Sequence, residues 1–357
     1  MKLMVCLSAV DRSELRLWRG LHKHGVELLV TCSPGAPRYA ELCESQFRVE
    51  PVYVKTRLDF KASSELRRLV REFGPDVLYA PSNKPLAAAL RATRGTSVRV
   101  MGYRGTIGHL SRWDPAAWIT YFHPRLSHIV SVSEAVRRYL CEEMRFAQSR
   151  VTTIYKGHDP AWYADPDSID LAQFNIPGDA FVVGFAGNMR PVKGVDVLLR
   201  AAKELPADSG IHLLLIGEVR DDTVSRLAAD RSIAARAHFV GYRSDAPALI
   251  AACDAFAMPS VEREGLPRAV FEAMAHALPV IVSDVGGMPE QVIAEETGIV
   301  VPPRDATALS RAMQQLAADS VLCESLGAAG RQRLASEFHI SRTIDQFNQL
   351  ILRVISS

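Results

Sequence analysis

The chain has 357 residues, of which 48% are hydrophobic and 23% are charged, and its formal net charge is +2. This composition is typical of a soluble globular protein with an ample core, and the length suits two domains of roughly 150–200 residues each. Residues 1–30 contain neither a signal peptide nor a membrane-spanning helix, which would need about 20 apolar residues.

The first half of the chain alternates short apolar runs with helical stretches. Strands are expected at 1–8, 26–32, 76–82, 97–103, 128–133 and 151–155. Helices are expected at 13–25, 60–74, 84–94 and 134–146. Strands that alternate with helices of about 10–15 residues predict a parallel sheet with crossover helices.

A polar, proline-containing stretch at 159–179 is typical of a linker, and a second alternation follows it. Strands are expected at 181–187, 212–217, 237–241, 255–260, 279–284 and 298–302. Helices are expected from Val195, near 221–235 and 245–252, at 267–277, and through most of the tail from Ala306. The two halves therefore predict an α/β protein with two doubly wound domains around a cleft, and a ligand at the carboxyl ends of the strands.

The charge is unevenly distributed along the chain. Residues 1–160 contain 25 Lys and Arg against 15 Asp and Glu, a net of +10, and the remaining residues contain 17 against 25, a net of −8. The basic half indicates an anionic partner, which we expect to be a phosphorylated acceptor or an acidic membrane surface. A solvated basic surface without a partner is the alternative. The basic residues lack the aromatic-interleaved pattern of a nucleic-acid-binding protein, and none is expected as a partner.

Six cysteines are scattered without a CxxC pair, and most have apolar neighbours. This usage favours buried free thiols in a reducing cytoplasm over a metal site or a disulfide framework.

The segment 184–202 places two cations in a loop between a strand and a helix. Gly187 allows the backbone to turn after the strand, and Arg190 and Lys193 follow before the helix begins. Fixed cations and helix-terminal amides stabilise the charge that develops on a departing nucleoside diphosphate.

The segment 262–290 carries two glutamates eight positions apart, Glu264 and Glu272. Pro267 fits the first turn of a helix, so the loop before it presents backbone amides that can bind a phosphate. A carboxylate on each side of that position can hold hydroxyl groups next to a bound diphosphate. This arrangement suits a nucleotide-sugar site.

The second half of the chain resembles the nucleotide-sugar-binding domain of retaining GT-B glycosyltransferases of family 4, in the glycogen-synthase-like group. The E-x7-E signature of that family is matched by Glu264 and Glu272, and the sequence AMAHALPVIVSDVGGMPE matches its continuation. The resemblance is specific over about 180–300 and weaker over 100–160. It implies a GT-B fold, with two Rossmann-like domains facing each other across a cleft.

The resemblance also assigns roles on the donor side. Glu264 would contact the sugar hydroxyls, Glu272 the ribose hydroxyls, and Lys193 the diphosphate. The turn at Arg243 would meet the base. The remaining donor-side residues are Gly187, Asn188, Gly265, Leu266 and Pro267.

The sequence departs from the family pattern at several positions. Asn188 stands where the family usually has Arg, and Arg190 is the candidate to replace that Arg. Arg104 stands where a His close to the sugar is expected, and His109 follows five residues later. Either Arg104 or His109 is a candidate for that position.

The first strand-to-helix loop lacks the Gly-Gly pair that is common in the family. Asp11 and Arg12 in this loop are therefore candidates for acceptor contacts, and Ser13 is expected to cap the following helix. Ser133 is interpreted as another helix cap, and His123 and His128 as packing or surface residues.

We expect three parts of the chain to have distinct roles. Residues 1–165 would form the acceptor-side domain, 166–340 the nucleotide-sugar-binding domain, and 341–357 a terminal helix that packs back on the first domain.

The resemblance implies a retaining transferase that moves a hexose from a nucleoside diphosphate sugar to an anionic glycan or glycolipid acceptor, in polysaccharide or lipopolysaccharide core assembly. No metal or other cofactor is expected, and we expect a cytoplasmic protein in peripheral contact with an anionic membrane surface. Two alternatives stay open. One is a nucleotide-sugar-binding protein without transfer activity, which Asn188 and Arg104 favour. The other is a GT-B-fold epimerase, against which the spacing of Glu264 and Glu272 argues. The absence of a GxGxxG motif argues against a dinucleotide-binding oxidoreductase.

Overall fold

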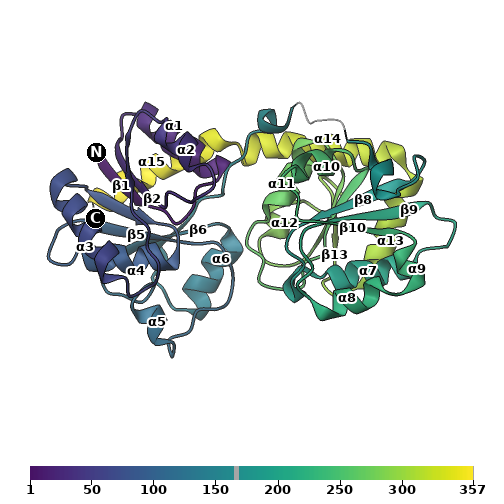
Figure 1. Ribbon diagram of the computed structural model, residues 1–357, viewed down its shortest axis with the longest axis horizontal. Coiled ribbons are helices and arrows are strands. Elements are labelled where there is room, and N and C mark those ends of the chain that lie inside the picture. The colour runs from purple at the N-terminus through teal and green to yellow at the C-terminus, as the bar shows by residue number, and fades with distance from the viewer. Residues whose placement is uncertain (165–168, 357) are drawn as a thin grey trace. The chain divides into compact units, whose positions relative to one another are not determined.

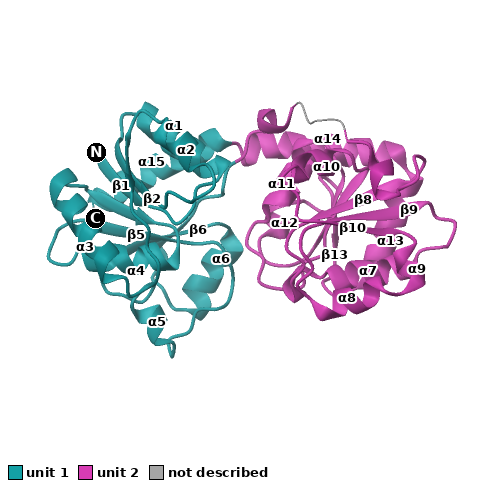
Figure 2. Cartoon of the chain, in the orientation of Figure 1, with its two compact units in different colours: residues 1–157, 340–357 teal, residues 158–339 magenta. Residues whose placement is uncertain are grey.

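A computed structural model describes residues 1–164 and 169–356 of the chain. It divides them into two compact units (Figures 1 and 2). Unit 1 comprises Met1–Gly157 with Ile340–Ser357, and unit 2 comprises His158–His339. Part of the predicted linker and the predicted domain boundary at residue 165 lie outside the described residues.

Unit 1 is built on a seven-stranded sheet in the order β3-β2-β1-β4-β5-β6-β7, and all of its strand pairs are parallel. Its strands are β1 (Lys2–Cys6), β2 (Glu27–Cys32), β3 (Arg48–Pro51), β4 (Val77–Ala80), β5 (Arg99–Arg104), β6 (Leu126–Ser131) and β7 (Val151–Thr153). Its α-helices are α1 (Arg12–Lys23), α2 (Tyr39–Cys43), α3 (Phe60–Phe73), α4 (Asn83–Ala92), α5 (Pro115–Trp118), α6 (Glu134–Arg138) and α15 (Ile340–Ser356).

Unit 2 is built on a six-stranded parallel sheet in the order β10-β9-β8-β11-β12-β13. Its strands are β8 (Phe181–Ala186), β9 (Ile211–Ile216), β10 (Ala237–Gly241), β11 (Ala255–Met258), β12 (Val280–Ser283) and β13 (Ile299–Val301). Its α-helices are α7 (Val195–Glu204), α8 (Asp222–Ala228), α9 (Arg231–Ala234), α10 (Ala246–Ala251), α11 (Arg268–Ala275), α12 (Met288–Gln291), α13 (Ala306–Ala318) and α14 (Ser320–Glu337).

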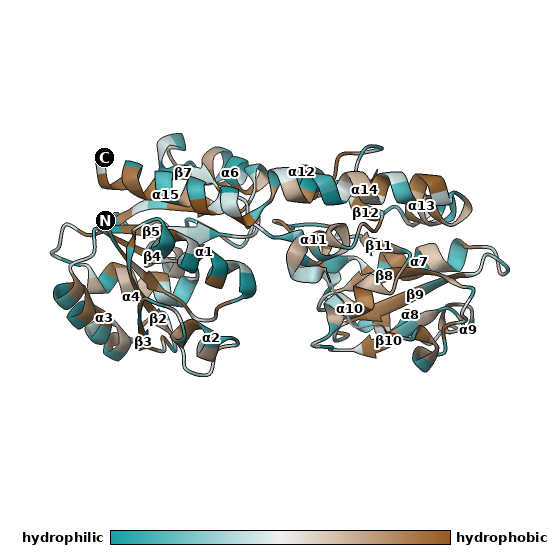
Figure 3. Cartoon of the chain, turned by 90° about the horizontal axis from the view of Figure 1, so that it is seen from above, coloured by the Kyte–Doolittle hydropathy of each residue, from teal (hydrophilic) through white to brown (hydrophobic). Residues whose placement is uncertain are grey.

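Both units are doubly wound, as the sequence predicted. Helices cover both faces of each sheet (Figure 1), and strands such as β4, β11 and β12 are therefore buried along their whole length. In Figure 3 the strands of unit 2 are largely hydrophobic, whereas α14 and α15 carry both hydrophilic and hydrophobic residues. The strand order reverses between β1 and β4 in unit 1 and between β8 and β11 in unit 2, and ligands of such folds bind at these switch points.

The structure corrects the sequence prediction at several elements. The short edge strand β3 was missed because its four residues are at most half-buried and carry no apolar run. The helix expected at 134–146 ends at Arg138 and continues as a π-helical turn, Tyr139–Glu143. The helix expected near 221–235 is divided, because Asp230 caps a new helix at Arg231.

The core of unit 1 includes a cluster of aromatic rings beneath α15. Trp18 of α1 lies 5.7 Å from Tyr79 and 5.8 Å from Phe347 of α15, measured between ring centroids. Tyr79 and Phe347 are 5.0 Å apart in an edge-to-face arrangement. Helix α15 is thus an integral part of unit 1. None of the helices in the described part of the chain combines the length and hydrophobicity that a bilayer span requires.

The six cysteines are free thiols. Cys6, Cys32 and Cys253 are buried as expected, whereas Cys43 is exposed and Cys141 and Cys323 are only partly buried. The expectation of burial was therefore wrong for Cys43.

Candidate functional site

The loop before α11 places Glu264, Gly265, Leu266 and Pro267 at the amino end of a mostly buried helix. Pro267 lies directly before the first helical residue, Arg268, and not inside the first turn as the sequence predicted. The first amides of a helix have no partner within it, so they are available to a ligand at this end. An anionic group is favoured there.

Glu264 is held by Lys193, from the loop after β8, and by Ser260, from its own loop after β11. Its Oε2 accepts a hydrogen bond from Lys193 Nζ at 2.8 Å and another from Ser260 Oγ at 2.9 Å. The side chains of Lys193 and Glu264 are 15% and 13% exposed, and Ser260 is fully buried. An ion pair this shielded is screened less by solvent than a surface pair. The structure therefore brings together two residues that the sequence assigned to different ligand groups.

The loops after β8 and β11 approach each other closely, which explains this pairing. The amide of Val261 donates to the carbonyl of Val192 at 2.9 Å. Gly194 adopts φ +65°, and a Cβ there would lie 2.0 Å from the carbonyl oxygen of Pro259. Only glycine fits at position 194, so only glycine allows the loop that carries Lys193 to contact the residues directly after β11.

A glycine turn after β12 lies against the backbone of Glu264. Gly286, after β12, adopts φ +59°, and a Cβ there would lie 1.9 Å from the carbonyl oxygen of Glu264. The next amide, that of Gly287, donates to the same oxygen at 3.4 Å. The turn at Gly286 and Gly287 thus fixes the position of the Glu264 backbone, from which the carboxylate side chain extends.

Glu272 lies inside α11 and is only 6% exposed. Its Oε1 is 3.1 Å from Nε of Arg268, whose side chain is 63% exposed. Burial raises the pKa of Glu272, and the charge of Arg268 opposes this only in part. A buried carboxylate with an elevated pKa is common at functional sites.

The cation-bearing loop is a tight turn. Gly187 directly follows β8, the amide of Arg190 donates to the carbonyl of Asn188, and the amide of Lys193 donates to the carbonyl of Arg190, both at 2.8 Å. Asn188 and Arg190 are exposed. The structure thus brings Lys193 to Glu264 and leaves Arg190 at the surface.

Arg243, which the sequence predicted to lie near the nucleotide base, interacts with neighbouring side chains of unit 2. Its guanidinium donates to both carboxylate oxygens of Asp245, at 2.8 and 2.6 Å, and lies over the ring of Phe174. The preceding Tyr242 is 73% exposed. Tyr242 is therefore the more accessible side chain of this turn.

In unit 1, Arg104 is buried and serves its own loop. Its guanidinium donates to the carbonyls of Thr106 and Gly108 and lies 5.3 Å from the ring centroid of Tyr121. His109 is exposed and has φ +54°. Arg104 thus holds the shape of this loop, and His109 is an exposed side chain on it.

Asp11 caps α1, the role that the sequence analysis gave to Ser13. The carboxylate of Asp11 accepts from the amide of Glu14 at 2.9 Å, and Glu14 Oε2 accepts from the amide of Asp11 at 3.1 Å, which completes a capping box. Asp11 also pairs with Lys156. Ser13 Oγ instead donates to the carbonyl of Gly157 at 2.6 Å, so its assignment as the cap was wrong. Arg12 is the first residue of α1 and is partly buried.

Two other sequence interpretations are confirmed. Ser133 caps α6 by accepting from the amide of Val136. His128 is buried against Thr152, and burial lowers its pKa to about 4, so it is a neutral packing residue.

Sequence reasoning missed two residues that support the loop carboxylate and the amino end of α11. One is Ser260, which lies just after β11. The feature of the sequence that could have identified it is its position at the carboxyl end of a central strand. The other is Gln291 of α12, which is fully buried and donates to the carbonyl of Pro267 at 3.1 Å. Its contact spans 24 residues, and no local pattern marks it.

Chemically, the site combines a shielded carboxylate, a cation beside it and a helix amino end. This combination can bind a hydroxyl-bearing anion and stabilise negative charge that develops on it. Within residues 1–164 and 169–356, no three His, Cys, Asp or Glu side chains are grouped to hold a metal ion.

Two protein-family models match most of the chain between them. The model described as Glycosyl transferases group 1 matches residues 167–333, and the model described as Glycosyltransferase Family 4 matches residues 10–162.

Two curated relatives come from Rhizobium meliloti. The lipopolysaccharide core biosynthesis glycosyltransferase LpsD is 25% identical over 348 residues, which cover 97% of this chain and 95% of LpsD. The lipopolysaccharide core biosynthesis glycosyltransferase LpsE is 31% identical over 185 residues, which cover 52% of this chain and 53% of LpsE.

Among solved structures, Anabaena HepE in complex with UDP and glucose superposes with a TM-score of 0.81 at 19% identity. The match covers 99% of this chain and 100% of HepE. At this level of identity the likeness establishes the fold.

Proposed function

The chain belongs to glycosyltransferase family 4 and is a retaining hexosyltransferase of GT-B fold, and from this premise we propose that it takes its hexose from a nucleoside diphosphate sugar. The acceptor that we propose is an anionic glycan or glycolipid of cell-surface polysaccharide or lipopolysaccharide core assembly. Unit 2 would bind the donor and unit 1 the acceptor.

The observation that carries the donor side is the contact between Lys193 Nζ and Glu264 Oε2 beside the amino end of α11. In the proposal, Glu264 accepts hydrogen bonds from the sugar hydroxyls, and Lys193 and the amides after Pro267 bind the diphosphate. Glu272 would accept from the ribose hydroxyls. HepE was solved with UDP and glucose, and its likeness to this chain supports a nucleoside diphosphate sugar as the donor class.

The transfer that we propose breaks the bond between the anomeric carbon and the diphosphate oxygen. A bond from the acceptor oxygen to the same carbon forms on the same face, and the acceptor proton passes to the departing phosphate oxygen. Lys193 and the helix amides neutralise the leaving group, with Arg190 as a second cation. We propose that this needs no metal, and unchanged turnover in the presence of a chelator is the expected result.

On the acceptor side, we propose that Asp11, Arg12, Arg104 and His109 shape or line the acceptor region. The net charge of +10 on residues 1–160 supports an anionic partner. The names of LpsD and LpsE support lipopolysaccharide core as the assembly in question.

We propose further that the protein works at the cytoplasmic face of the membrane through its basic half. The test is sedimentation with vesicles of phosphatidylglycerol and phosphatidylcholine at low and high salt. Binding to the anionic vesicles that is lost at high salt is expected, because salt screens surface charge. Equal sedimentation without vesicles would contradict this proposal.

The reaction itself is tested by a donor screen. UDP-, GDP- and ADP-hexoses are incubated with purified core oligosaccharides or lipid-linked saccharides, and the released nucleoside diphosphate is measured. We expect release that depends on both donor and acceptor. Release by no donor with any such acceptor would overturn the proposed substrate classes.

A further inference from the structure

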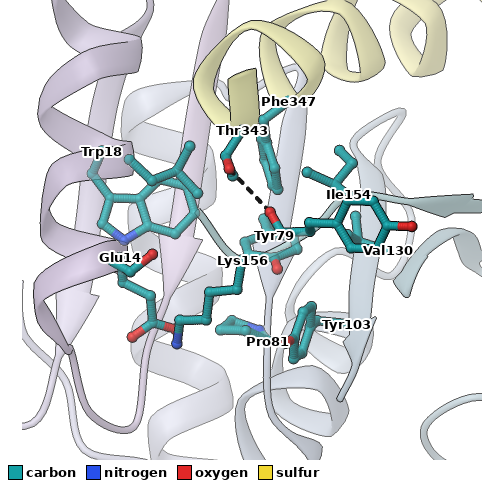
Figure 4. A pocket seen from close by; sticks show the side chains of 13 residues that line it. Glu14, Trp18, Tyr79, Pro81, Tyr103, Val130, Ile154, Lys156, Thr343 and Phe347 are labelled. Atoms are coloured by element: carbon teal, nitrogen blue, oxygen red, sulfur yellow. Dashed lines mark hydrogen bonds between the residues drawn. The ribbon is translucent and has the colours of Figure 1, made fainter. Parts of the chain in front are cut away.

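A small cavity opens in unit 1 between α1, α15 and the carboxyl ends of β4, β5, β6 and β7 (Figure 4). Its volume is about 40 Å³. A single water needs about 10–15 Å³ on the same measure, so the cavity holds more than one water-sized group. All of its lining residues belong to unit 1.

The cavity contains a buried hydrogen-bond donor that nothing in the described protein satisfies. Trp18 is 0% exposed, and its Nε1 has no acceptor among the described residues. The indole N–H can only donate, and leaving such a group unpaired costs about 1–3 kcal/mol. Tyr79 and Phe347 fix the ring. In Figure 4 the indole nitrogen lies on the edge of the ring that faces Glu14 and Lys156.

Acceptor groups lie on the same side of the cavity. Glu14 Oε2 accepts from the amide of Asp11, and the carboxylate also interacts with the charge of Lys156. Tyr103 also lines the cavity, and burial raises its pKa to about 12, so its hydroxyl stays protonated and can donate and accept. A group in the cavity therefore meets both donors and acceptors.

The charges at the mouth of the cavity disfavour an anion. Lys156 pairs with Asp11, and their side chains are 31% and 30% exposed, so this pair reaches the solvent. Burial disfavours the ammonium of Lys156, but the carboxylates of Glu14 and Asp11 outweigh burial and raise its pKa. Burial raises the pKa of Glu14 as well, and the charge of Lys156 opposes this only in part. Above that raised pKa, two carboxylates face one ammonium. The excess negative charge repels a phosphate or carboxylate.

We propose that this cavity is a subsite for a neutral, hydroxyl-bearing edge of a sugar, which accepts from Trp18 Nε1 and donates to Glu14. This proposal rests on the proposed function, because it takes a glycan as the acceptor. It adds which part of that glycan binds here. The anionic groups of the acceptor bind elsewhere on the basic unit, and a neutral hydroxymethyl or ring hydroxyl enters here.

The test follows the indole N–H signal of Trp18 by proton–nitrogen NMR of the full chain, and the Trp18→Phe variant assigns that signal. The probes are methyl α-D-glucopyranoside, methyl α-D-galactopyranoside, methyl α-D-mannopyranoside and glucose 6-phosphate. We expect at least one neutral glycoside to shift the signal saturably and glucose 6-phosphate to leave it unmoved.

Two variants separate charge from shape. Glu14→Gln keeps the size of the side chain and weakens neutral glycoside binding about 5- to 10-fold, because a hydrogen bond to a charged acceptor becomes a neutral one. Glu27→Gln is the control, because Glu27 is an exposed strand residue that pairs with Lys2 outside the cavity. It should bind like the wild type.

Two results would overturn the subsite. One is a Trp18 signal that no neutral glycoside moves, which would leave the cavity a water site. The other is an equal shift by glucose 6-phosphate. Release of nucleoside diphosphate, measured on the same samples, keeps the two proposals apart. Release of nucleoside diphosphate without a shift of the Trp18 signal refutes the subsite and leaves the proposed function. A shift of the Trp18 signal without release refutes the proposed function and leaves the subsite.

Discussion

Lys193 Nζ lies 2.8 Å from Glu264 Oε2, although the two residues are 71 positions apart in the chain. The cation proposed for the diphosphate thus pairs with the carboxylate proposed for the sugar. Each ion compensates the other while both are shielded from water. A donor that inserts its diphosphate beside Lys193 would give this cation a new anionic partner, while Glu264 would keep the hydrogen bond from Ser260 and accept further ones from the sugar hydroxyls.

Ser260 is expected to act through Glu264. Its buried hydroxyl donates to the same carboxylate oxygen as Lys193. A hydrogen bond to a charged group contributes about 1.5–3 kcal/mol, so Ser260→Ala should lower kcat/KM about 10-fold or more. Steady-state kinetics with a saturating acceptor measure this. Ser260→Thr keeps the hydroxyl and should recover most of the rate, and equal rates in Ser260→Ala and the wild type would refute the positioning role.

Gly286→Ala should displace the backbone of Glu264. The new Cβ would lie 1.9 Å from that carbonyl oxygen, so the loop must move, and activity should fall well beyond what the loss of stability explains. Gly25→Ala is the matched control, because Gly25 also has positive φ, +82°, but its Cβ would meet nothing within 4 Å. The control should lose only about 1–2 kcal/mol of unfolding free energy, the usual cost of a left-handed alanine, and keep its activity. Calorimetry and kinetics on both variants check this, and an active Gly286→Ala enzyme would count against a fixed loop.

Glu272→Gln should separate stability from donor binding. Burial raises the pKa of Glu272 above 4.5, so the folded protein holds this proton more tightly than the unfolded chain does. The stability of the wild type therefore falls as the pH rises from below 4.5 through the raised pKa, and at neutral pH the buried charge is a cost.

The glutamine variant removes that cost. It should be more stable than the wild type at pH 7 and no more stable at acidic pH, while its KM for the donor rises about tenfold through weaker contacts to the ribose. Thermal melts at several pH values and donor kinetics measure the two effects. A stability difference that does not change with pH would show that the charge of Glu272 is not the cause.

The sequence predicted the doubly wound fold because apolar strands, helix lengths and turns are local patterns. It also identified Lys193 and Glu264 singly, each from its position near the start of a helix. Their pairing could not be predicted, because it depends on the approach of the loops after β8 and β11, which Gly194 permits, and on the position of the Glu264 backbone, which Gly286 permits. The buried contact of Gln291 with Pro267 likewise arises only in the folded unit.

The first loop of unit 1 was misassigned for a different reason. Asp11 and Glu14 have the spacing of a capping box, a local signal that identifies Asp11, and not Ser13, as the cap. Arg104 and His109 were the two candidates for the position close to the sugar, and nothing local in the sequence indicates that the Arg104 guanidinium donates to the carbonyls of Thr106 and Gly108.

The central claim is that Lys193 and Glu264 form the donor site, and it is tested most directly by nucleoside diphosphate release from Lys193→Ala and Glu264→Ala. Lys203→Ala is the control, because Lys203 also pairs with a carboxylate, that of Asp230, at 2.7 Å, but its side chain is 56% exposed. Circular dichroism melts establish that all three variants are folded. We predict that release falls about 10²- to 10³-fold in the first two variants and stays at the wild-type rate in Lys203→Ala. Wild-type release by folded Lys193→Ala or Glu264→Ala would contradict the claim.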